Sequence, residues 1–153
     1  MPSARRTSDL TAHLGYWLRY VSNHVSQAFA RKVEAHGVTV AEWALMRRLF
    51  EEKALAPSRL AERMGMTRGA ISKLADRLIA KSLLARTADS QDGRAQTLSL
   101  TRAGRSMVPK LAALADVNDA EFFDHLAPME RAALLRTLRE LVEKRGLKSL
   151  PVD

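Results

Sequence analysis

The chain has 153 residues, which suits one domain with a hydrophobic core, and 46% of them are hydrophobic but only 5% aromatic. No apolar run approaches the roughly 20 residues that span a bilayer, and the polar stretch Met1 to Asp9 lacks the apolar segment of a signal peptide. The absence of cysteine excludes disulfides, thiolate metal ligands and thiol-based redox sensing. We therefore expect a cytoplasmic, mainly helical protein.

The net charge of +8 is concentrated in the middle third of the chain. Residues 57–110 contain eleven Lys/Arg and four Asp/Glu, a balance of +7, whereas the balance is +3 before and −2 after this segment. Such a concentration is typical of a surface that binds a polyanion. A solvated basic surface without a partner has the same composition, so the motifs have to decide between the two.

Two helices are predicted before residue 57. From about Asp9 to His36 the apolar residues recur at helical spacing, and Gly37 is suited to end this helix in a left-handed conformation. A helix of this length at a terminus often packs against a second subunit. Thr39 and Glu42 then form a capping box that begins a second helix.

The next two helices form a predicted helix-turn-helix. Pro57 suits the first position of a short third helix, because its missing N–H is not needed there. Gly65 supplies the turn, and Thr67 caps a fourth helix whose apolar residues share one face.

A β-hairpin and two long helices complete the chain. Leu83–Thr87 and Gln96–Leu100 are predicted strands, and the Asp-Gly pair between them is a strong turn signal. Thr101 and Pro128 begin a fifth and a sixth helix, and Gly146 ends the last one. The predicted fold class is therefore mainly α with a small β-hairpin.

The exposed face of the fourth helix has the chemistry of a DNA-reading helix. Small residues allow close approach to base edges, Arg68 can reach the O6 and N7 atoms of guanine, and Ser72 can contact a base edge or a phosphate. At the tip of the hairpin, Arg94 suits insertion into a narrow minor groove. The candidate DNA-binding residues are Ser58, Thr67, Arg68, Gly69, Ser72, Lys73, Arg77, Asp92 and Arg94.

Beyond these candidate residues, a pattern of sequence motifs extends along nearly the whole chain, from about Leu14 to Leu141. It is carried by Leu60-Ala61-Glu62-Arg63-Met64-Gly65-Met66-Thr67-Arg68, by Leu74-Ala75-Asp76-Arg77-Leu78, by Leu83-Leu84-Ala85-Arg86, and by Asp92-Gly93-Arg94 followed by Leu98-Ser99-Leu100-Thr101 and Gly104. In these motifs the chain resembles the MarR family of winged helix-turn-helix transcriptional regulators. The resemblance implies that Asp92 orients Arg94 and that Arg94 probes the minor groove. Gly93 replaces a basic residue common in the family, and Ala127 replaces the usual Ser/Thr cap of the last helix.

The resemblance also implies a homodimer joined by the first and the last two helices. We expect residues 1–37 to form a dimerisation helix, residues 38–101 the winged helix-turn-helix lobe, and residues 102–153 the helices that complete the dimerisation region of one compact domain. Two-fold symmetry predicts a palindromic operator, because each recognition helix reads only a few base pairs. The predicted function is that of a repressor.

The aromatic residues near the first two helices have two interpretations. The resemblance implies a pocket here for a small aromatic or phenolic effector, which His13, Trp17 and Trp43 would line. Tryptophan and tyrosine at helical spacing are equally well explained by core and dimer packing.

Other classes of function have little support in the sequence. The chain has no phosphate-binding glycine loop, nucleophile elbow or His-Glu-x-x-His motif, and its four histidines are scattered, so we expect no catalytic residue, metal or cofactor. The alternative is a winged helix that binds RNA or protein without a regulatory role. Residues 57–110 contain no aromatic residue for base stacking, which disfavours RNA.

Overall fold

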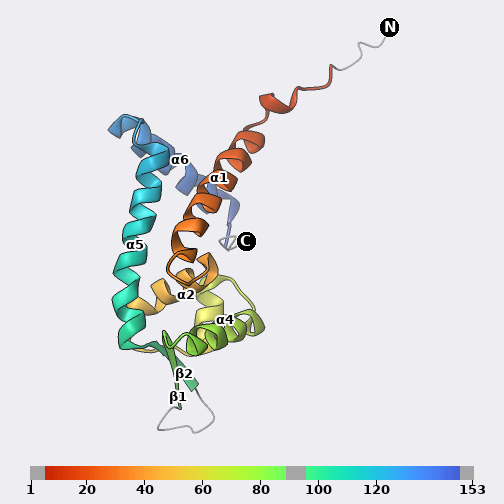
Figure 1. The fold of residues 1–153 in the computed structure, drawn as a ribbon. Coiled ribbons are helices and arrows are strands. Elements are labelled where there is room, and N and C mark those ends of the chain that lie inside the picture. The colour runs from red at the N-terminus through yellow and green to blue at the C-terminus, as the bar shows by residue number, and fades with distance from the viewer. Residues whose placement is uncertain (1–5, 89–95, 149–153) are drawn as a thin grey trace.

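The computed structural model describes residues 6–88 and 96–148. In this part of the chain six α-helices, one short 3₁₀ helix (η1) and a two-stranded hairpin follow one another (Figure 1). Their bounds are η1 Leu10–Ala12, α1 Leu14–Glu34, α2 Val40–Phe50, α3 Pro57–Met64, α4 Arg68–Ala80, β1 Leu84–Ala88, β2 Gln96–Leu100, α5 Arg102–Phe123 and α6 Pro128–Arg145. The predicted fold class, mainly α with a small hairpin, is confirmed. None of the described helices is long and apolar enough to cross a membrane.

The molecule has a compact lobe at one end and long helices at the other (Figure 1). The long helices α1 and α5 lie against each other, and α2, α3, α4 and the hairpin gather at their lower end. The largest fully buried side chains lie almost all in this lobe: Leu45, Met46, Leu49, Leu60, Ile71, Leu78 and Leu98. The lobe therefore has its own core, which fixes α4 and the hairpin relative to each other.

Helix α6 has a different environment. In the described part of the chain it has no buried residue. Met129 is 85% exposed, and five further apolar residues are 39–47% exposed, namely Leu134, Leu135, Leu138, Leu141 and Val142. Its cap is also weaker than a full capping box, because Glu130 accepts the Ala127 N–H at 2.9 Å but alanine has no side-chain acceptor to return the bond.

The element boundaries follow the predicted signals closely, although α1 ends at Glu34, two residues before the predicted His36, and β1 ends at Ala88, one residue after the predicted Thr87. The first helix does not run unbroken from Asp9, because His13 has an extended backbone (φ −94°, ψ 126°) that separates η1 from α1. Strand β1 begins one residue after the predicted Leu83, because the Leu83 N–H closes helix α4 by donating to the carbonyl oxygen of Leu78 at 3.0 Å.

Strand β2 is hydrogen-bonded on both of its edges. Strands β1 and β2 pair antiparallel, with Leu84 opposite Leu100. On the other side, Leu55 and Leu98 exchange two backbone hydrogen bonds of 3.0 and 2.7 Å. At the base, the glycine at position 104 lets α5 pass so close that a Cβ there would lie 2.1 Å from the Leu83 carbonyl oxygen. The strands are therefore fixed to the loop before α3 and to the start of α5.

Candidate nucleic-acid interface

The turn between α3 and α4 depends on a left-handed residue. Gly65 has φ +62° and ψ +30°, a conformation that glycine adopts without strain. The Met66 N–H donates to the Ala61 carbonyl oxygen at 3.0 Å and the Gly65 N–H to that of Glu62 at 3.3 Å, so two carbonyls of the last turn of α3 are satisfied. The chain then enters α4 at Thr67, whose hydroxyl oxygen accepts the Ala70 N–H at 3.1 Å. This is the short helix, tight turn and second helix that the sequence predicts.

Helix α4 presents one apolar and one polar face. Its buried residues are Ile71, Leu74, Ala75 and Leu78. The opposite side is solvent-exposed and contains five of the predicted DNA-binding residues, Thr67, Arg68, Gly69, Ser72 and Lys73. Ser58 lies in the first turn of α3 and is half-buried. The lobe core therefore fixes which side of α4 is free to meet a partner.

Gly69 has space around it. In the described part of the chain, a Cβ built at this position would meet one atom within 4 Å, the Thr67 hydroxyl oxygen at 4.0 Å. Its φ is not positive, so the backbone does not require glycine either. The missing side chain is therefore not explained by the fold of one chain.

The recognition helix is tied to the hairpin by an ion pair. Arg86 on β1 donates to the Asp76 carboxylate on α4 at 3.0 Å. Both residues belong to the motifs noted in the sequence, but we assigned neither a role from the sequence. The opposite charges of Asp76 on the predicted recognition helix and Arg86 on the predicted strand were the available signal. The predicted wing residues Asp92 and Arg94 lie outside the described residues.

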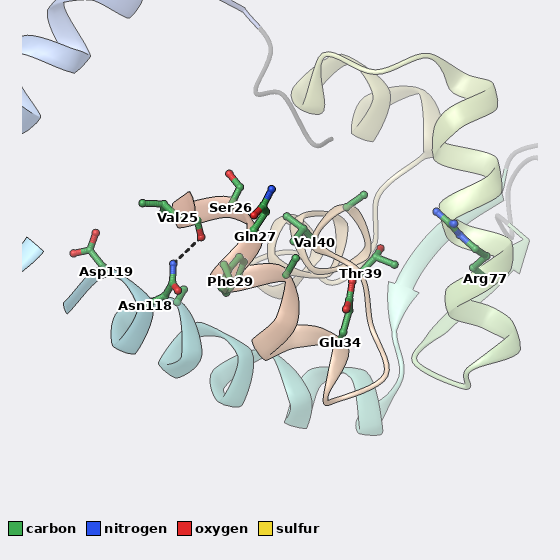
Figure 2. Close-up of a pocket in the computed structure, with 13 residues that line it drawn as sticks. Val25, Ser26, Gln27, Phe29, Glu34, Thr39, Val40, Arg77, Asn118 and Asp119 are labelled. Atoms are coloured by element: carbon green, nitrogen blue, oxygen red, sulfur yellow. Dashed lines mark hydrogen bonds between the residues drawn. The ribbon is translucent and has the colours of Figure 1, made fainter. Parts of the chain in front are cut away.

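Arg77 lies on a different flank of α4 from Arg68, since nine residues at about 100° each separate them by half a turn of the helix. Its side chain lines a cavity of about 590 Å³ between the lobe and the long helices (Figure 2). The other walls come from α1, the start of α2 and α5. Phe29 and Val40 are among the apolar lining residues, and Asn118 is among the polar ones.

The Asn118 amide forms a polar floor on the α5 side of this cavity. It is 3% exposed, and its Nδ2 atom donates to the Val25 carbonyl oxygen on α1 at 3.1 Å. Its Oδ1 atom accepts a hydrogen bond from the Lys32 ammonium at 3.0 Å, and Lys32 also pairs with Glu121 at 2.7 Å. This network joins α1 to α5 directly beside the cavity.

The three predicted effector-binding residues are not brought together in one chain, and none of them lines the cavity. His13 is exposed just before α1, and Trp17 is 49% exposed with its Nε1 donating to the Thr11 carbonyl oxygen at 2.9 Å. Trp43 packs edge-on against Phe29, with ring centroids 6.4 Å apart. Phe29 is twelve residues, or about 18 Å along the helix, from Trp17.

Comparison with known proteins gives matches to one family of regulators. A sequence model described as the MarR family matches residues 36–95, which include α2, the helix-turn-helix and β1. The HTH-type transcriptional repressor MdtR of Bacillus subtilis (strain 168) is 29% identical over 145 residues, or 95% of this chain and 84% of that protein. These two matches support a MarR-type transcriptional regulator with a winged helix-turn-helix.

Two solved structures have the same fold. A mutant MarR of E. coli in complex with operator DNA matches with a TM-score of 0.77 at 21% identity, over 88% of this chain and 99% of that one. BpsR of Bordetella bronchiseptica, whose DNA binding is regulated by 6-hydroxynicotinic acid, matches with a TM-score of 0.77 at 23% identity, over 89% of this chain and 97% of that one.

Proposed function

We propose that this MarR-type chain is a repressor that binds a palindromic operator as a homodimer and releases it when a small aromatic acid binds. The observation that carries the proposal is the division of exposed surface. The lobe leaves the polar face of α4 free for DNA, while α1 and α6 leave apolar faces that one chain does not cover.

The apolar surface argues for a second copy of the chain. Besides the side chains of α6, Leu14 is 82% exposed at the start of α1, and Trp17, Leu18, Tyr20 and Val21 are 43–54% exposed. Soluble monomers rarely leave a continuous apolar patch of more than a few hundred Å². Packing of residues 1–37 and 102–153 against the same segments of a second copy would cover these faces and leave both lobes, residues 38–101, free.

We assign the DNA contacts by position on the lobe. Arg68 and Ser72 would meet base edges in the major groove, and the missing side chain of Gly69 would allow the backbone to come close. Lys73 would contact phosphate, as would the hydroxyls of Thr67 and Ser58. Arg94, oriented by Asp92, keeps its sequence-based assignment to the minor groove.

For the effector we infer the cavity between the lobe and the long helices. Its volume of about 590 Å³ lies in the range of small-molecule sites. Phe29 and Val40 offer apolar contact to a ring, and the Arg77 guanidinium can pair with a carboxylate. The regulation of BpsR by 6-hydroxynicotinic acid supports this chemical class. We therefore assign Arg77 to the cavity in place of the DNA contact expected from the sequence.

Selection of bound duplexes from a random DNA pool tests the proposal. We expect one enriched site with two inverted half-sites whose centres lie about 10 base pairs apart, because two recognition helices must enter successive major grooves. Benzoate and salicylate added to the complex should release the enriched duplex, and Arg77→Met should weaken this release more than it weakens DNA binding. Enrichment of a single site without inverted symmetry would contradict the proposed binding as a homodimer.

A further inference from the structure

A buried ion pair joins α2 to the end of the recognition helix. The Glu42 side chain on α2 is completely buried, and the Lys81 ammonium donates to its two carboxylate oxygens at 2.9 and 2.8 Å. Lys81 is the C-cap residue of α4. The pair therefore connects a helix of the lobe core with the point where the recognition helix ends.

Two residues hold the Glu42 carboxylate in place, Lys81 and Thr39. Its Oε1 atom also accepts the Thr39 N–H at 3.1 Å in the capping box of α2. Burial alone would raise the pKa of Glu42, but the hydrogen bonds from Lys81 and Thr39 outweigh this effect and lower the pKa below its usual value. The carboxylate is thus ionised at neutral pH, and its direction is fixed by the start of its own helix.

The pair is adjacent to the cavity. Thr39, Val40 and Ala41, which immediately precede Glu42, line the cavity, and so does Arg77, one helical turn before Lys81. A bound molecule that moves the start of α2 would therefore act on the pair and on α4 together. Apart from the exposed Asp76–Arg86 ion pair with β1, the buried contacts of α4 with the lobe are apolar, and apolar packing is less directional than a charge-assisted hydrogen bond.

We propose that Glu42 and Lys81 are positioning residues that fix the angle at which α4 is presented to DNA. This inference rests on the proposed operator binding and deepens it. A buried ion pair is a weak source of stability, since desolvation opposes the attraction. Its directional geometry explains its presence better, because a small rotation of α4 would move Arg68 and Ser72 away from their base edges.

Two variants separate the role of the pair in positioning α4 from its effect on the stability of the protein. Lys81→Met leaves Glu42 buried without its cation, so this variant should lose stability. In the double variant Glu42→Gln with Lys81→Met the buried charge is gone, and glutamine retains the capping bond to Thr39. We expect the double variant to recover most of the thermal stability but to bind the selected operator about tenfold more weakly than the wild type. Its affinity for a shuffled duplex of equal length should be unchanged.

Two further variants serve as controls. Lys110→Met is matched to Lys81→Met in residue type and in net charge, but it removes an exposed cation on α5. It should therefore affect binding of the operator and of the shuffled duplex equally. Glu42→Gln alone leaves Lys81, whose side chain is 37% exposed, free to turn into solvent. This variant should fold at neutral pH and show a smaller loss of affinity for the selected operator than the double variant.

Each other outcome overturns the inference. If the double variant is stable and binds the operator as the wild type does, the pair is structural only. If it loses affinity equally for both duplexes, Lys81 contacts phosphate instead. If the wild type selects no preferred duplex at all, the operator proposal itself fails, and the positioning role fails with it.

Discussion

At the scale of single residues, Gly69 offers the sharpest separation of fold from function. It occupies the second position of α4 with open space around its Cα, so alanine fits there and is the better helix former. We expect Gly69→Ala to raise the free energy of unfolding by up to about 1 kcal/mol, measured by urea titration. Affinity for the selected operator should fall, because the added methyl group lies where the helix approaches the bases. Unchanged affinity would mean that α4 does not approach DNA closely at this position.

Arg68 and Lys73 should differ in what they contribute. Arg68 is the first residue of α4, whereas Lys73 lies in its second turn, and both are exposed. Arg68→Ala should cost about 1–3 kcal/mol at one base pair and relax the preferred site there. Lys73→Ala should weaken binding to all sequences and reduce the salt dependence by about one ion. Titrations of matched and mismatched duplexes at several salt concentrations distinguish the two. A preferred site that survives Arg68→Ala unaltered would refute the assignment of Arg68.

At the scale of elements, the end of α4 contains a strained residue. Ser82 has φ +60°, and the bonds from Ser82 N–H to Ile79 and from Leu83 N–H to Leu78 make it the left-handed residue of a Schellman motif. Ser82→Gly should relieve this strain and stabilise the protein by about 1 kcal/mol. The same change at Ser72, in the regular interior of α4, should destabilise by about 0.5–1 kcal/mol. Urea titration of the two variants gives the comparison, and a loss of stability in Ser82→Gly would show that the serine hydroxyl matters more than the backbone strain.

Local signals in the sequence were sufficient to predict the helices and strands but not to predict how they pack. The capping box at Thr39, the Thr67 cap and the turn at Gly65 mark helix ends because the bonds they make are local in sequence. The orientation of Arg77 toward a cavity depends on how α4 lies against α1 and α2, and the helical pattern of α4 contains no information on that packing. The Glu42–Lys81 pair joins residues 39 positions apart, so the sequence showed Glu42 only as a cap.

At the scale of the whole molecule, the ionised Glu42 makes stability depend on pH. Its pKa in the folded protein is lowered, so its contribution is complete above the unfolded pKa of about 4.3 and is lost as the pH falls through the lower folded value. The wild type should therefore lose more stability than Glu42→Gln between pH 6 and about pH 3. Urea midpoints of both proteins at these pH values test this. Parallel losses in the two proteins would contradict the role of the Glu42 carboxylate.

Two copies of the chain must bind one operator if the proposed function is right, and the mass in solution tests this most directly. One chain has a mass of 17.0 kDa, so sedimentation equilibrium at micromolar concentration should give about twice that value for the free protein. On the selected duplex the complex should contain two chains and one DNA molecule, and substitution of Leu138 and Leu141 on α6 by glutamate should yield monomers with weak operator binding. A free mass near 17.0 kDa, or one chain per duplex at full affinity, would contradict the account.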